Sequence, residues 1–177
     1  MNKILTIIII FLSTSVLSAN ERDAKLDKLF MELKTNITSS SPMIAQQIWS
    51  LWSTHPTDEK LTSILDEGSR LVQDRQLARA INVFTEVIKL DPTWAEAWNK
   101  RATVFYMVGE FDKSQDDIDK VLELEKRHFG ALAGQGMVNI QLKNYDKAKR
   151  SYQKVQEIYP AMKSSKVMIE QIEELIK

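Results

Sequence analysis

The sequence predicts an all-α protein built from repeated two-helix units, and two observations carry this prediction. Three consecutive segments of equal length align with one another without gaps. Gly and Pro are scarce, at 5 and 4 residues, which is roughly half of average usage, whereas a turn-rich β protein needs more of both. The chain of 177 residues, 44% hydrophobic and 27% charged, is long enough for one globular domain with a core.

Residues 1–19 are expected to be a secretory signal peptide rather than part of the fold. Lys3 precedes an apolar run from Ile4 to Leu12, and a tail rich in small residues ends at Ala19. The run is shorter than the about 20 residues that a membrane span needs, so we expect export to a bacterial periplasm. The tail carries a leucine near the cleavage site. An uncleaved anchor that holds the chain in the inner membrane, facing the periplasm, therefore stays open as the alternative.

The segment 20–56 is predicted to form a pair of amphipathic helices packed before the first repeat. Ser41 is the expected N-cap of the second helix, because Pro42 suits its first turn. Apolar residues recur at helical spacing in both halves of the segment: Leu26, Leu29, Phe30 and Leu33, then Ile44, Ile48, Leu51 and Trp52.

The three repeats cover 61–94, 95–128 and 129–162, and residues of one kind recur at the same position in each. A small residue in the first helix of a repeat allows the second helix to approach closely. A large side chain then fills the space that the small residues leave open. The columns that show this pattern are Gly68, Ala102 and Gly136, and Ala80, Ser114 and Ala148, with Phe84, Ile118 and Tyr152 as the large side chains.

A last amphipathic helix is predicted over residues 163–177. Its apolar side chains lie on one stripe and its charged side chains lie away from that stripe. A repeat array needs such a helix, because the end of the last repeat is otherwise an exposed apolar surface. We therefore expect 163–177 to be a C-terminal capping helix.

The repeated segments resemble the tetratricopeptide repeat family over residues 61–162. The resemblance is carried by the run from Tyr145 through Ala148 and Tyr152 to Pro160, and by Trp98 in a column where the family often has Trp. More narrowly, residues 95–102 and 127–134 resemble small exported repeat proteins of Alphaproteobacteria. The resemblance implies a right-handed superhelical array whose first helices line a concave groove, in which the family binds peptides, helices or loops of partner proteins.

Few residues in the chain are suited to catalysis or to metal binding. The histidines are His55 and His128, which lie far apart in the sequence, and there is no Cys, so each is interpreted as a helix-end histidine rather than a metal ligand. Gly130, Gly134 and Gly136 follow no strand, so they are interpreted as helix-packing positions and not as a phosphate loop. We expect no catalytic residue, cofactor or metal, and no small-molecule substrate. The formal net charge of zero argues against a nucleic-acid partner.

Two further groups of residues are expected to have structural roles. Trp49, Trp52 and Trp98 are expected in the core, whereas Trp94, at a repeat junction, is expected to be partly exposed. The acidic residues of the second repeat are expected to form a solvated helix face, since lysines lie among them: Asp112, Asp116, Asp117 and Asp119.

The predicted groove is nearly neutral and half apolar, which suits an uncharged or amphipathic segment of another protein. Some family members hold a carboxylate with Lys, Asn and Arg residues, but the matching columns here hold Leu65, Ser69, Lys100, Gly130 and Gly134, so that clamp is absent. By helical spacing, the predicted partner-binding residues are Leu65, Ser69, Asn99, Thr103, Tyr106, Ala133, Met137 and Ile140.

Two functions are consistent with the sequence. The first is a non-enzymatic periplasmic adaptor or scaffold that binds a peptide or helix of another protein in its concave groove. The second is a structural component of a cell-envelope assembly, held by an uncleaved N-terminal anchor or by self-association. An enzyme is a third class, for which the sequence supplies few suitable residues.

Overall fold

The computed structural model describes residues 21–35 and 39–177, so the predicted signal peptide at 1–19 lies outside the described residues. All regular structure in the described part is α-helical, which confirms the all-α prediction. None of the described helices has the length and apolar character to cross a membrane. A first helix over 21–35 is followed by α2 (Ser41–Ser53), α3 (Glu59–Gln73), α4 (Leu77–Leu90), α5 (Ala95–Met107), α6 (Phe111–Leu124), α7 (Phe129–Gln141), α8 (Tyr145–Ile158) and α9 (Lys163–Ile176).

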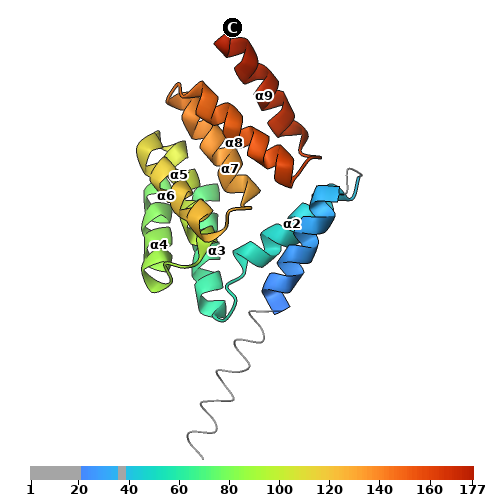
Figure 1. Cartoon of the computed structure of the whole chain (residues 1–177). Helices are drawn as coiled ribbons and strands as arrows, with labels where there is room; N and C mark the ends of the chain where they lie inside the picture. The colour runs from blue at the N-terminus through green and yellow to red at the C-terminus, as the bar shows by residue number, and fades with distance from the viewer. Residues whose placement is uncertain (1–20, 36–38) are drawn as a thin grey trace, which may run out of the picture.

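The helices α3 to α8 form consecutive pairs that stack side by side (Figure 1). The second helices α4, α6 and α8 begin at equal intervals along the chain, at Leu77, Phe111 and Tyr145. The first helices repeat with the same spacing, since α5 and α7 begin at Ala95 and Phe129. The sequence period therefore corresponds to a structural period of one helical pair.

Glycine allows the close approach of helices at two of the predicted small-residue positions. A Cβ atom added to Gly68 would lie 2.4 Å from Cε1 of Phe84, and one added to Gly136 would lie 2.5 Å from Cε2 of Tyr152. The rings of Phe84 and Tyr152 are buried. They occupy the space left by the missing side chains, which confirms the packing inferred from the columns.

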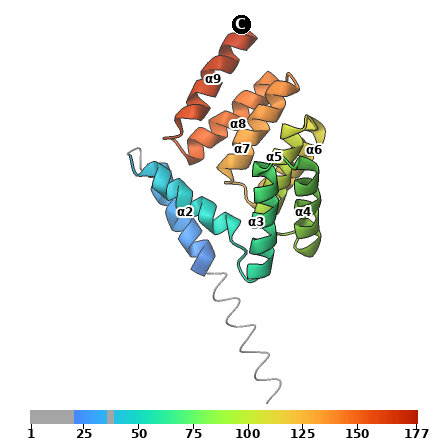
Figure 2. The same cartoon turned by 180° about the vertical axis from the view of Figure 1, so that it is seen from behind.

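The N-terminal pair does not pack in front of the first repeat, and this prediction is wrong. The pair lies on the side of α3 and α7 that faces away from α4 and α6 (Figures 1 and 2). Leu33 and Ile48, from its two helices, are fully buried in one core cluster with Phe129 of α7 and Val155 of α8. Apolar periodicity shows that a helix buries one face, but it does not identify the helix on which that face packs.

Polar contacts fix the pair against the repeats as well. The indole N–H of Trp94 donates to the backbone carbonyl of Trp52 at 2.8 Å. The Arg127 guanidinium lies 2.6 Å from Oδ1 of Asp27 and 4.3 Å above the Phe30 ring. Trp94 is only 5% exposed, so the prediction of a partly exposed Trp94 is wrong. The helix α2 starts at Ser41 with Ser40 at its N-cap, one residue earlier than predicted.

The last helix, α9, continues the register of the first helices. It begins at Lys163, one repeat period after the start of α7, and buries Ile172. At the position of Gly68 and Gly136 it carries Glu170, which is exposed. A glutamate side chain there is larger than the hydrogen of Gly68 and Gly136, so this position lacks the small residue that allows a second helix to approach closely in the repeats.

Candidate partner-binding groove

The first helices and α9 line a groove made of three connected depressions. One of about 310 Å³ lies between α3, α5 and Trp49 of α2. A slot of about 80 Å³ separates α5 from α7, and a depression of about 370 Å³ lies between α5, α7, α8 and α9. The first depression and the slot share Asn99 and Thr103, and the slot and the last depression share Tyr106 and Met137. The three depressions therefore form one continuous surface.

Seven of the eight residues predicted from helical spacing line this groove, and one does not. Leu65 is 1% exposed and packs in the core between the first two repeats, so its assignment to the groove is corrected. The helix α3 is rotated so that Leu65 faces inward. The residues that line the groove as predicted are Ser69, Asn99, Thr103, Tyr106, Ala133, Met137 and Ile140.

Asn99 belongs to a buried polar network beneath the groove. It is 9% exposed, and its side-chain amide donates to Oε2 of Glu96 at 3.0 Å. The same oxygen lies 3.2 Å from Nε2 of His128, and Lys100 Nζ lies 3.5 Å from Oε1 of Glu96. Because burying an unpaired carboxylate is costly, these contacts are needed to keep Glu96 in the core. Asn99 therefore supports the fold as well as lining the surface.

His128 lies at a helix end, as predicted, whereas His55 lies in the connection between α2 and α3. His128 is the N-cap of α7, and its Nδ1 accepts the backbone N–H of Ala131 at 3.0 Å. A neutral ring whose Nδ1 accepts carries its hydrogen on Nε2, so His128 donates to Glu96. Its ring stacks on Trp52 with centroids 4.0 Å apart and planes 8° apart. His55 makes the equivalent pattern, with Nδ1 accepting from the Asp58 N–H at 2.9 Å and Nε2 lying 2.8 Å from Asp91.

The end of the groove near α9 is mostly apolar. Met137 is 41% exposed, and Ile140, Ala133 and Met168 lie around it. A flexible thioether at an exposed position suits contact with partners of different shape. Burial raises the pKa of the nearby Tyr152 hydroxyl to about 12, so this tyrosine is neutral near pH 7 and adds no charge to the groove.

Trp49, Ser164 and Met168 are among the groove-lining residues that were not predicted from the sequence. Trp49, predicted in the core, is only partly buried and lines the first depression, with its ring packed on Gly130. Ser164 and Met168 extend the groove because α9 continues the register of the first helices. The repeat period contained this signal, since Ser164 and Met168 stand one period after Gly130 and Gly134.

Charge is nearly absent from the groove. Lys100 is the one charged side chain among the described residues that line the three depressions, and Glu96 holds its ammonium group. In the described ranges 21–35 and 39–177, no cluster of three His, Cys, Asp or Glu side chains is arranged to hold a metal ion. The groove can therefore offer apolar contact and hydrogen bonds, with little electrostatic attraction.

An ion pair behind the groove corrects one sequence assignment. Asp117 does not lie on a solvated face as predicted: it is 3% exposed and accepts two hydrogen bonds of 2.8 Å from the Arg101 guanidinium. Burial raises the pKa of Asp117, and the contact with Arg101 partly offsets this rise. Arg101 also donates to the Thr85 hydroxyl at 3.0 Å and lies 5.1 Å from the Trp98 ring centroid. This pair ties α4, α5 and α6 together.

Comparison with known proteins confirms the resemblance to the tetratricopeptide repeat family. Residues 130–162 match the family model described as a tetratricopeptide repeat. A TPR repeat-containing protein of Rhizobium etli is 28% identical over 151 residues, which is 85% of this chain and 74% of the relative. Human sperm-associated antigen 1 is 26% identical over 121 residues, and there the match covers 68% of this chain but only 13% of the relative.

Solved structures share the fold at low sequence identity. The first TPR of Spaghetti (RPAP3), bound to the HSP90 peptide SRMEEVD, has a TM-score of 0.65 and 19% identity, over 67% of this chain and 94% of that one. The Yersinia enterocolitica type III secretion chaperone SycD, in complex with a peptide of the translocator YopD, has a TM-score of 0.64 and 12% identity, over 68% and 98%.

Proposed function

We propose that this tetratricopeptide repeat protein is a non-enzymatic adaptor that binds a segment of another protein in its groove. The observation that carries the proposal is the continuous surface along α3, α5, α7 and α9. Similar folds that hold peptides of HSP90 and of YopD support it.

The chemistry of the groove favours an amphipathic segment with little charge. Near α3 the lining mixes apolar side chains with the polar side chains of Ser69, Gln73 and Thr103, and near α9 it is more strongly apolar, with Met137 and Ile140. A peptide rich in carboxylates, such as SRMEEVD, would meet one lysine that is already paired with Glu96. We therefore infer a partner segment that places apolar side chains against Met137 and Ile140 and hydrogen-bonding groups against the polar side chains near α3.

Site-specific photo-crosslinking in cells tests this assignment. A photoreactive amino acid would replace Met137 in the groove or, as a control, Leu90, which is 64% exposed on α4 and lines none of the three depressions. We expect one specific partner, crosslinked from Met137 and not from Leu90. Crosslinks of equal yield and identity from both positions would contradict binding in the groove.

We further propose that the chain acts in the periplasm after cleavage of residues 1–19. The alternative is a structural envelope component that keeps this segment as an inner-membrane anchor or self-associates. Cell fractionation with determination of the N-terminal residue separates the two. A periplasmic chain that begins near Asn20 supports the adaptor, and a membrane-bound chain that begins at Met1 supports the structural component.

A further inference from the structure

A row of four basic residues runs along one exposed side of α8 and the turn before it. These residues, which we call the basic stripe, are Lys143, Lys147, Arg150 and Lys154, and all four are exposed. None of them forms an ion pair with any carboxylate in the described part of the chain, whereas the neighbouring Lys149 lies 2.7 Å from Glu173 of α9. The stripe therefore differs from Lys149, whose charge the fold itself neutralises.

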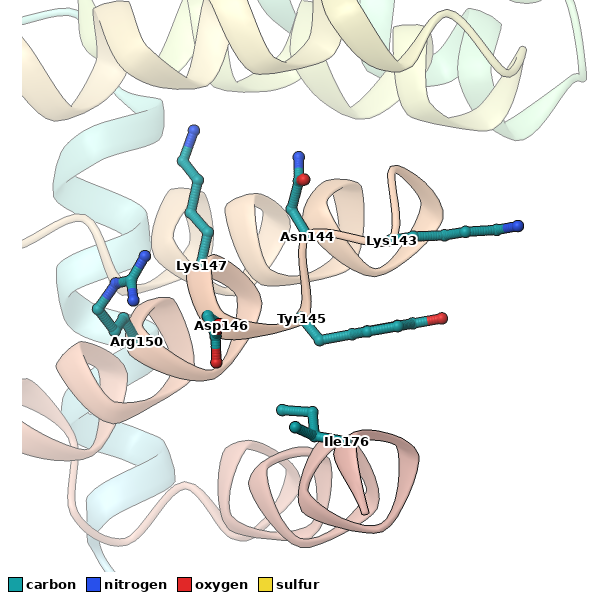
Figure 3. Close-up of a pocket in the computed structure, with 7 residues that line it drawn as sticks. All are labelled: Lys143, Asn144, Tyr145, Asp146, Lys147, Arg150 and Ile176. Atoms are coloured by element: carbon teal, nitrogen blue, oxygen red, sulfur yellow. The ribbon is translucent and has the colours of Figure 1, made fainter.

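The fold gains no stability from this arrangement. Like charges three or four residues apart on a helix destabilise it, and α8 contains two such spacings, from Lys147 to Arg150 and from Arg150 to Lys154. Asp146 is the acidic residue closest in sequence, but Figure 3 shows its side chain pointing away from Lys147. A partner that supplies carboxylates would remove the repulsion.

The stripe borders a depression of about 540 Å³ that also contains apolar surface. Lys143, Lys147 and Arg150 line it together with Asn144, Tyr145, Asp146 and Ile176, so three cations and one carboxylate border the depression. Ile176, from the end of α9, is 48% exposed and lies opposite Tyr145 (Figure 3). The site thus combines unpaired cations with a place for one apolar side chain.

We propose that the basic stripe is a second docking surface, which binds an acidic segment of a partner protein. Carboxylates of that segment pair with Lys147, Arg150 and their neighbours, and one apolar side chain packs between Tyr145 and Ile176. None of the depression's lining residues belongs to the groove. This surface is therefore independent of the proposed groove function.

A short acidic peptide fits this surface better than a nucleic acid does. From position 143 to 154 the stripe extends for only about 16 Å at the helical rise per residue. The whole chain has a pI of about 6.8, whereas nucleic-acid-binding domains are usually strongly basic. Exposed carboxylates at Asp112 and Asp116 of α6, the preceding second helix, would repel a longer polyanion.

Fluorescence anisotropy on the chain from residue 20 onward tests the proposal. The probe is a labelled peptide, about as long as the stripe when helical, in which Glu and Ser surround a single central Leu. We expect Lys147→Glu/Arg150→Glu to weaken binding by at least about tenfold, with the largest effect at low salt. The control Lys60→Glu/Arg70→Glu makes the same change of charge on exposed residues of α3, and it should weaken binding by less than about twofold.

A second variant separates specific docking from simple charge attraction. Ile176→Ser keeps the charge, and it should weaken binding several-fold at every salt concentration. Equal losses in the stripe and control variants, or no peptide binding at all, would overturn the proposal. Tighter binding of a labelled oligothymidylate than of the peptide would replace it with a nucleic-acid surface. Loss of peptide binding in Tyr106→Ala/Met137→Glu would place the peptide in the groove instead.

Discussion

Gly136 and Gly134 lie close together in α7, and their replacement by alanine is expected to change stability in opposite directions. An alanine Cβ at Gly136 would lie 2.5 Å from Cε2 and 2.7 Å from Cζ of Tyr152, whose ring is buried and has little room to move. An alanine Cβ at Gly134 would meet Cδ1 of Ile118 at 3.5 Å, which is an ordinary contact.

The expected magnitudes follow from two opposing terms. Alanine is favoured over glycine inside a helix by about 1 kcal/mol, so Gly134→Ala should raise the free energy of unfolding by that amount. Overpacking costs about 1–3 kcal/mol, and the short contacts to Tyr152 place Gly136→Ala near the upper end. After the helical gain, the free energy of unfolding of Gly136→Ala should fall by about 1–2 kcal/mol.

Thermal melts followed by circular dichroism measure the difference between these two variants. In a protein of this size about 1 kcal/mol changes Tm by about 2–4 °C, so Gly134→Ala should melt roughly 4–12 °C above Gly136→Ala. The double variant Gly136→Ala/Tyr152→Leu tests the cause, because a smaller side chain should relieve the clash. A Gly136→Ala variant as stable as the wild type would refute the packing argument.

Two further predictions concern buried and partly buried charges. Arg101→Met leaves Asp117 buried without its partner, so urea denaturation should show that the free energy of unfolding falls by about 3–5 kcal/mol. The double variant Arg101→Met/Asp117→Leu should recover most of this loss. A fall of less than about 1 kcal/mol in Arg101→Met would contradict the buried pair. Burial pushes the pKa of Asp91 upward, but hydrogen bonds from Thr93 and His55 outweigh it and hold this pKa below its ordinary value of 3.8. A carboxyl group whose pKa is lowered by folding stabilises the folded state at pH values above its unfolded-chain pKa. This stabilisation is lost as the pH falls through the folded-state pKa. Stability of the wild type should therefore fall below about pH 4, and Asp91→Asn should show a flatter acid limb in melts between about pH 2 and pH 6; identical acid limbs would contradict this assignment.

Periodicity predicted most of the fold because the same physical constraint acts three times in this chain. Gly68 and Gly136 recur where a second helix must approach, and Phe84 and Tyr152 fill the resulting space. Gly134 has no such neighbour within 3.4 Å, so its interpretation as a close-packing position is wrong. Periodicity gives the spacing of the small-residue positions, and the side chains of the neighbouring helices determine how tightly each position packs.

The long-range contacts could not be predicted from the sequence, because no local residue pattern specifies which distant helices pack together. The spacing of apolar residues predicts the buried faces of the N-terminal pair, but it does not identify α7 and α8 as the helices on which these faces pack. Asp117 differs from its neighbour Asp116 because it faces Arg101 on the adjacent helix α5. Successive residues of a helix lie about 100° apart around its axis, so the rotation of α3 about its axis decides whether Leu65 faces the core or the groove.

The most direct test of the proposed groove is the affinity of the partner segment identified by crosslinking. Isothermal titration calorimetry would compare the wild type with Tyr106→Ala/Met137→Glu, which removes a lining ring and places a charge among apolar side chains. The matched control is Leu90→Glu, a charge placed at an exposed position outside the groove. We expect at least about tenfold weaker binding for the groove variant, with the control within about twofold of the wild type. Equal affinity for all three proteins would contradict binding in the groove.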